Sequence, residues 1–266
     1  DDLNIATPFL DGSLKAPIWV SSMTGGAAAA GQINKNLARA CGEFGLGMGL
    51  GSCRTLLESD EFLPDFQLRK LIGDQPLYAN LGVAQLEELI DAGKLNLVVE
   101  LVKKLEANGL IIHINPLQEW FQPEGDRYKR SSLETITEVL NKVNHKIIVK
   151  EVGQGMGPRS LKELMKLPLA AIDFGAFGGT NFSRLEILRD RVGLKKSHEG
   201  LALVGHSAEE MVSFVNSNLE LLKEDVVCNE FIISGGVHSF LDGYYLKEKI
   251  NSNSIYGHAK LFLEYA

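Results

Sequence analysis

The sequence is poor in cysteine, and its few cysteines have no regular spacing. Cys41, Cys53 and Cys228 form no CxxC pair. An odd, sparse set of this kind argues against a disulfide framework or a zinc site, and it predicts a reducing compartment. We therefore expect a cytoplasmic protein in which Cys53 and Cys228 are packing residues.

Long apolar runs and an excess of positive charge are also missing. No apolar run approaches the roughly 18 residues of a membrane span, and no signal peptide is visible. Lysine and arginine number 27 against 34 aspartates and glutamates, which gives a formal net charge of −7. We therefore expect neither a membrane nor a nucleic-acid partner, although backbone N–H groups and a few cations could still hold one phosphate.

Several catalytic motifs are absent as well. The sequence contains no P-loop, no GxSxG and no HExxH. Its nearest approach to a dinucleotide-binding turn, at 45–49, has the wrong glycine spacing and no acidic residue in the right place. An open doubly wound sheet is therefore the less favoured of two α/β arrangements.

The chain does contain eight short, almost continuously apolar runs, which are typical of strands buried on both faces of a parallel sheet. They are Ile18–Ser21, Gly45–Leu50, Leu77–Leu81, Leu110–Ile114, Ile147–Val152, Ala170–Phe174, Phe231–Ser234 and Ile255–His258. Amphipathic stretches lie between them, and two of these open with capping-box pairs, Ser131 with Glu134 and Ser207 with Glu210. Eight such units predict a single (β/α)8 barrel domain over residues 1–266.

A ninth apolar run, Leu201–Val204, is ambiguous. It leads straight into the helix expected at 207–222, and no separate crossover precedes it after the helix expected at 182–191. We therefore interpret it as a lead-in to that helix and keep the strand count at eight.

In a parallel barrel the loops after the strand ends build the site. Glycines 235–236 and the turn at 257–260 follow the seventh and eighth strands, where barrels usually bind phosphate, although glycine also serves tight turns. Lys150 closes a buried strand, so its ammonium either pairs with Glu151 or Asp173 or faces a cofactor or phosphate, which we favour.

The end of the fourth strand gathers further polar residues. His113 is followed closely by Asn115, Gln118 and Glu119, which favours substrate contact over a core role for the histidine. The Gln118 amide can orient a substrate but is a poor acid or base. Glu119 is a natural Mg²⁺ ligand beside a diphosphate, and its alternative is a solvated loop carboxylate.

The NPLQE motif at 115–119 and the QPEGDR motif at 122–127 resemble the signature of type 2 isopentenyl diphosphate isomerase. Four further segments occur in the family's order along the chain: SMTGG at 22–26, VKEVG at 149–153, GGTNF at 178–182 and SGG at 234–236. The resemblance therefore covers essentially the whole chain. The first two motifs are highly specific, whereas SGG is shared by many flavin barrels.

The resemblance implies an FMN-binding barrel that interconverts isopentenyl and dimethylallyl diphosphate with Mg²⁺ and no net redox change. The FMN is reduced with NADPH and is thought to move the proton itself. The implied FMN contacts are Ser22, Met23, Thr24, Ser52, Asn80, Lys150 and Thr180, with Gly235, Gly236, Val237, His238, Ala259 and Lys260 around the phosphate. The implied substrate contacts are His113, Asn115, Gln118 and Arg54, with Gln118 as the catalytic residue and Glu119 as the Mg²⁺ ligand. The resemblance also suggests a homo-oligomer, a tetramer.

The chain departs from the family pattern in three ways. A basic N-terminal segment that grips diphosphate is missing, the chain stops soon after the eighth strand, and the segments at 51–54 and 173–177 are looser matches. Two alternative functions therefore stay open. A 2-hydroxy-acid oxidase would need an arginine beside His206 or His238, where there is none. A non-catalytic flavin- or phosphate-binding barrel is favoured only by the missing cations.

Overall fold

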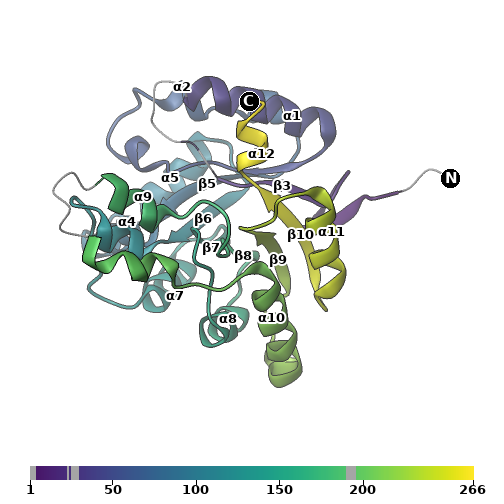
Figure 1. Cartoon of the computed structure of the whole chain (residues 1–266). Coiled ribbons are helices and arrows are strands. Elements are labelled where there is room, and N and C mark those ends of the chain that lie inside the picture. The colour runs from purple at the N-terminus through teal and green to yellow at the C-terminus, as the bar shows by residue number, and fades with distance from the viewer. Residues whose placement is uncertain (1–3, 23, 25–29, 190–195) are drawn as a thin grey trace.

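Eight parallel strands close into a barrel in a computed structural model that describes residues 4–22, 24, 30–189 and 196–266 (Figure 1). The strands are β3 (Ile18–Val20), β4 (Gly47–Gly49), β5 (Leu77–Gly82), β6 (Gly109–Ile114), β7 (Lys146–Glu151), β8 (Ala171–Asp173), β9 (Glu230–Ser234) and β10 (Asn253–His258). They pair in chain order, and β10 closes the barrel against β3. Each apolar run predicted as a strand coincides with one of them, so the predicted barrel is confirmed.

Helices surround the strands (Figure 1). They are α1 (Ala30–Phe44), α2 (Leu63–Phe66), α3 (Arg69–Ile72), α4 (Val83–Asp91), α5 (Asn96–Lys104), α6 (Pro116–Phe121), α7 (Ser132–Lys142), α8 (Pro158–Met165), α9 (Phe182–Arg189), α10 (Ala208–Leu222), α11 (Phe240–Lys249) and α12 (Lys260–Leu263). The described residues also form the 3₁₀ helices η1 (Arg54–Leu57), η2 (Lys196–Leu203) and η3 (Lys223–Asp225). Both predicted capping boxes form, at the starts of α7 and α10. Most of the ambiguous run at 201–204 lies in η2, which confirms that it is no ninth strand.

The sequence analysis missed a short antiparallel hairpin, β1 (Thr7–Phe9) and β2 (Gly12–Leu14). Its buried Phe9 and Leu14 cluster with Trp19 and Tyr78 and with aliphatic side chains from the inside of the barrel. Phe9 packs edge-on against Trp19, with ring centroids 6.3 Å apart, and Trp19 packs the same way against Tyr78 at 6.0 Å. The hairpin therefore seals the amino-terminal end of the barrel with an apolar plug, which leaves the other end for a site.

A second, larger cluster fills the space between the strands and the helices. It takes the outward-facing strand residues, such as Leu81 and Val149, and the apolar faces of the helices, such as Leu86 and Val139. Within the described residues, no helix is both long and apolar enough to cross a membrane.

Candidate functional site

The inside of the barrel changes from apolar to polar towards the carboxyl ends of most of its strands. Side chains two residues apart on a strand share a face. Six strands place a polar residue two positions beyond an apolar interior one. The pairs are Trp19 and Ser21, Tyr78 and Asn80, Ile111 and His113, Ile148 and Lys150, Ala171 and Asp173, and Ile232 and Ser234. We call Ser21, Asn80, His113, Lys150, Asp173 and Ser234 the polar ring, and it forms the floor of the candidate site.

Lys150 on β7 and Asp173 on β8 lie next to each other in the strand register, and both side chains are buried in the polar ring. The Lys150 ammonium donates to the backbone carbonyl of Glu151 at 2.6 Å rather than forming an ion pair with a described carboxylate. Asp173 accepts a hydrogen bond from the Ser234 hydroxyl, and its other oxygen has no partner among the described residues. Burial raises the pKa of Asp173, and nearby Lys150 opposes that rise.

His113 is half-buried on the floor, opposite Lys150 in the strand register. Its Nδ1 lies 2.7 Å from Oδ1 of Asn80, whose Nδ2 donates to the carbonyl of Leu50 at 2.9 Å. Burial, and after it the charge of Lys150, lowers the pKa of His113 to about 4. The imidazole is therefore neutral at physiological pH.

The NPLQE and QPEGDR motifs form one hydrogen-bonded unit at the end of β6. Asn115 donates to Gln118 at 3.2 Å and to Oε1 of Glu119 at 2.9 Å, and it accepts from the Tyr128 hydroxyl at 3.1 Å. Oε2 of Glu119 accepts the backbone N–H of Asp126 at 2.8 Å. The predicted substrate and metal residues are thus held together, with the amide of Gln118 half-buried at their edge.

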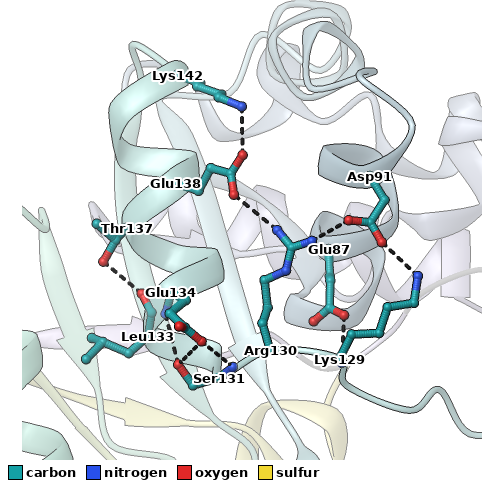
Figure 2. A network of polar contacts seen from close by, with 10 residues as sticks. All are labelled: Glu87, Asp91, Lys129, Arg130, Ser131, Leu133, Glu134, Thr137, Glu138 and Lys142. Atoms are coloured by element: carbon teal, nitrogen blue, oxygen red, sulfur yellow. Dashed lines mark hydrogen bonds and ion pairs between the residues drawn. The ribbon is translucent and has the colours of Figure 1, made fainter.

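The loop after α6 is fastened to the neighbouring helices, as Figure 2 shows. The backbone N–H of Lys129 donates to Glu87 on α4 at 2.7 Å, and its ammonium pairs with Asp91 at the same distance. Arg130 reaches between the helices and bonds both Asp91 on α4 and Glu138 on α7 (Figure 2). These pairs fix the loop that presents Asp126 to the site.

Asp126 in turn joins η1 and α4. Its Oδ2 accepts from Arg54 at 3.3 Å and from Gln85 at 3.0 Å. The half-exposed Arg54 guanidinium is therefore held at the rim of the site.

Glycines from the loops after β8 and β9 meet backbone to backbone. Gly178 (φ +113°), Gly235 (φ +84°) and Gly236 (φ +68°) adopt conformations that L side chains rarely reach. A Cβ on Gly178 would lie 3.2 Å from Cα of Gly236. The backbone N–H groups of residues 235–238 donate to no described residue. Residues 178–179 and 235–238, which we call the glycine cradle, present the donors that bind anions.

Metal-binding groups are sparse. Among the residues that the structure describes, no three His, Cys, Asp or Glu side chains gather closely enough to hold a metal. Glu119 is the carboxylate that the sequence singles out, and each of its oxygens already accepts one N–H donor. A divalent ion at Glu119 would therefore need most of its ligands from a substrate and water.

No family model matches the chain. It is 35% identical over 272 residues to an isopentenyl-diphosphate delta-isomerase of Rickettsia felis, a match that covers 100% of this chain and 74% of that protein. It is 37% identical over 246 residues to the protein of the same name from Rickettsia akari, covering 91% and 68%. The chain belongs to the isopentenyl-diphosphate delta-isomerase family. Membership of this enzyme family confirms the resemblance carried by the NPLQE and QPEGDR motifs.

Solved structures agree with the isomerase-family barrel at the level of the fold. A mandelate oxidase with a monooxide FMN adduct matches 96% of the chain with a TM-score of 0.57 and 11% identity. A Pediococcus acidilactici lactate oxidase matches 97% with a TM-score of 0.59 and 13% identity. Both are barrel proteins of much greater length, since the match covers 69% and 67% of their chains.

The described site residues predicted for this isomerase-family chain lie at strand ends and in the loops and short helices that follow them. Asn80, His113, Lys150 and the NPLQE residues lie in or beside the polar ring, and Ser22 has a buried hydroxyl without a partner among the described residues. Ser52, Thr180, His238 and Lys260 are exposed, and Lys260 lies 3.8 Å from Glu264. Thr24, Val237 and Ala259 are half-buried, and Met23 lies outside the described residues.

The sequence analysis did not identify Asp173 and Ser21 as floor residues, and it missed the contacts of Tyr128 and Asp126. The period of two from Ala171 and Trp19 could have found the first pair. No local sequence pattern predicts the contacts of Tyr128 and Asp126, because their partners lie on other segments of the chain.

Proposed function

We propose that the protein is an FMN-dependent isomerase that interconverts isopentenyl diphosphate and dimethylallyl diphosphate. The observation that carries the proposal is the convergence, at one end of the barrel, of the NPLQE unit, the polar ring and the glycine cradle. It is supported by membership of a family whose relatives are named isopentenyl-diphosphate delta-isomerase.

The residues present fit FMN. The cradle offers unpaired backbone N–H groups of residues 235–238 to a phosphate, and a Cβ at Gly178 would crowd the backbone there. The buried hydroxyl of Ser22 has no partner among the described residues, so it is available to a bound ring system. Thr24, Ser52, Asn80, Lys150 and Thr180 would complete the contacts, with Val237, His238, Ala259 and Lys260 around the phosphate. When bound and reduced, FMN would supply the acid–base chemistry of the proton shift.

The chain's own side chains would bind and orient the substrate. The isomerisation moves a double bond by adding a proton at one carbon and removing one from another, so no net redox change occurs. The Gln118 amide, held by Asn115, can hydrogen-bond and align the substrate but cannot exchange a proton at neutral pH. Lys150 supplies positive charge on the floor, and Arg54 supplies it at the rim.

The structure is compatible with Mg²⁺ at Glu119. Mg²⁺ commonly takes one or two carboxylates together with substrate phosphates and retained waters. Glu119 offers one carboxylate, oriented by Asn115 and by the backbone of Asp126. The ion would therefore bind together with the diphosphate rather than ahead of it.

Other parts of the proposal rest on the sequence alone. The resemblance implies NADPH as the reductant and a homo-oligomeric state. The cysteine usage predicts a cytoplasmic location, and the negative net charge and the lack of long apolar runs argue against nucleic-acid and membrane partners. None of them enters the argument from the site.

The test uses the FMN-loaded protein, reduced under anaerobic conditions and supplied with isopentenyl diphosphate and Mg²⁺. We expect dimethylallyl diphosphate to form, and we expect Gln118→Asn to lose turnover at least tenfold while it still binds FMN. Gln75→Asn, at the opposite end of β5, is the matched control and should keep full turnover. Bound FMN without product would favour the non-catalytic barrel, and oxidation of a 2-hydroxy acid would favour the oxidase. Unchanged turnover in Gln118→Asn would refute the role of Gln118.

A further inference from the structure

We propose that Asn80 is a positioning residue that fixes His113 as the neutral Nδ1–H tautomer and so leaves Nε2 as a hydrogen-bond acceptor on the floor of the site. The proposal rests on the isomerase function proposed above only in taking this floor as the substrate site. It goes beyond that function by assigning the hydrogen-bonding state of one side chain and the residue that sets it.

The orientation of the Asn80 amide follows from its two partners. Its NH₂ group donates to the carbonyl of Leu50 at 2.9 Å, and a carbonyl oxygen can only accept. The reversed amide would place two acceptors against each other. The Asn80 oxygen must therefore face Nδ1 of His113, 2.7 Å away, and only a protonated Nδ1 can donate to it.

Gly82 leaves room for the ring on its other side. A Cβ on Gly82 would lie 2.8 Å from Nε2 of His113 and 2.3 Å from Oε1 of Gln85. The backbone of Gly82 is extended, at φ −76° and ψ 152°, so glycine is not required for its conformation. Its missing side chain instead leaves the space that Nε2 occupies.

Burial, and after it the charge of Lys150, lowers the pKa of His113 and keeps the second nitrogen unprotonated. Lys150 on β7 stands opposite His113 in the register, and Asp173 on β8 lies beyond Lys150. On α6, the Glu119 carboxylate is engaged by Asn115 and by the N–H of Asp126. The cation nearest in register therefore opposes an imidazolium, and no described residue donates to Nε2.

The assigned tautomer constrains what can meet His113. A neutral Nδ1–H imidazole accepts at Nε2 and cannot donate from it. A diphosphate oxygen carries no hydrogen at neutral pH, so a contact between it and Nε2 would require His113 to take up a proton. In the unliganded protein, Nε2 is therefore suited to a ligand N–H or O–H group or a water molecule.

Nitrogen NMR of the FMN-loaded protein labelled with ¹⁵N-histidine tests the proposal. The His113 signal is the one lost in His113→Gln. At pH 7 we expect a pyrrole-type Nδ1 and a pyridine-type Nε2. Asn80→Asp adds a carboxylate beside Nδ1, which favours the imidazolium, so the titration midpoint of His113 should rise by at least one pH unit. Asn229→Asp adds the same charge at the opposite end of the barrel and should leave it unchanged.

Asn80→Leu separates tautomer control from folding. It removes the acceptor, so a measurable share of His113 should move to the Nε2–H tautomer while the far-UV circular dichroism spectrum of the protein is retained. A pyridine-type Nδ1 in the unmodified protein, or an unchanged tautomer in Asn80→Leu, would overturn the proposal. The readout is independent of turnover. Expected spectra without isomerase activity would therefore refute the proposed function and leave the tautomer assignment standing.

Discussion

Glu151 is predicted to hold the loops of the site together, and its removal should be costly. It is buried at the end of β7, where one carboxylate oxygen accepts the backbone N–H groups of Gly153 and Gln154 at 2.7 Å and of Gly155 at 2.8 Å. The turn so formed supports the next loop, because the N–H of Gly155 donates to the carbonyl of Gly175 at 3.1 Å.

The expected loss follows from the donors that Glu151→Ala would leave without an acceptor. The N–H of buried Gly153 has no access to water, and such an orphaned group costs about 1–3 kcal/mol. The N–H of Gln154 is partly exposed and regains water, and the N–H of Gly155 keeps the carbonyl of Gly175 as an acceptor, so these two groups add less. We expect a loss of about 3 kcal/mol in the free energy of unfolding. Glu151→Gln keeps one acceptor without the charge and should lose about half of that.

Urea unfolding checks the estimate through the midpoint and the slope of the transition. Glu163→Ala on α8 is the control, because Glu163 is exposed and bonds only Lys166 among the described residues. We expect no measurable change there. A loss below about 1 kcal/mol in Glu151→Ala, or a loss equal to that of Glu163→Ala, would refute the reasoning.

Two further predictions concern the cradle and the loop of Figure 2. Gly236→Ala forces a side chain onto φ +68° and places Cβ 2.9 Å from the Phe177 carbonyl, so the Kd for FMN should rise about tenfold in a fluorescence titration. Gly93→Ala has the same strain (φ +66°) in open space and should leave that Kd unchanged. Arg130→Ala removes the cation that joins Asp91 on α4 to Glu138 on α7, so hydrogen exchange of the Asp126 amide should accelerate at low salt. The acceleration should be much smaller at 1 M NaCl, because salt already screens the ion pairs in the unmodified protein. Equal acceleration at both salt concentrations would contradict this.

The barrel strands could be predicted because burial on both faces leaves an unmistakable apolar run. Ile147–Val152 shows this, since its apolar core lies wholly inside β7. The β1–β2 hairpin lacks every such signal. Each strand has three residues, Pro8 lies within the first, and the turn places Leu10 and Asp11 at φ +52° and +66° without a glycine or an asparagine.

The site was predictable where motifs lie next to each other in the chain, and not where it depends on distant partners. NPLQE marks Asn115, Gln118 and Glu119, and the structure bonds these three to one another. The bond between Asn80 and His113 joins residues 33 positions apart, and only the barrel brings them together. Packing likewise decides against an ion pair of Lys150 with Glu151 or Asp173, since its ammonium bonds a backbone carbonyl. The contact of Lys150 with a cofactor or phosphate stays a prediction.

The apolar plug and the polar ring depend on each other. Phe9 and Trp19 close the amino-terminal end of the barrel, so water does not reach the polar ring from that side. The ionisable groups of the ring must therefore be stabilised by neighbouring side chains and backbone groups. Burial lowers the pKa of His113 and raises that of Asp173, so both tend towards their neutral forms. Lys150 adds a cation to the ring. A floor of this kind favours an electron-rich or anionic ligand before any loop contact is made.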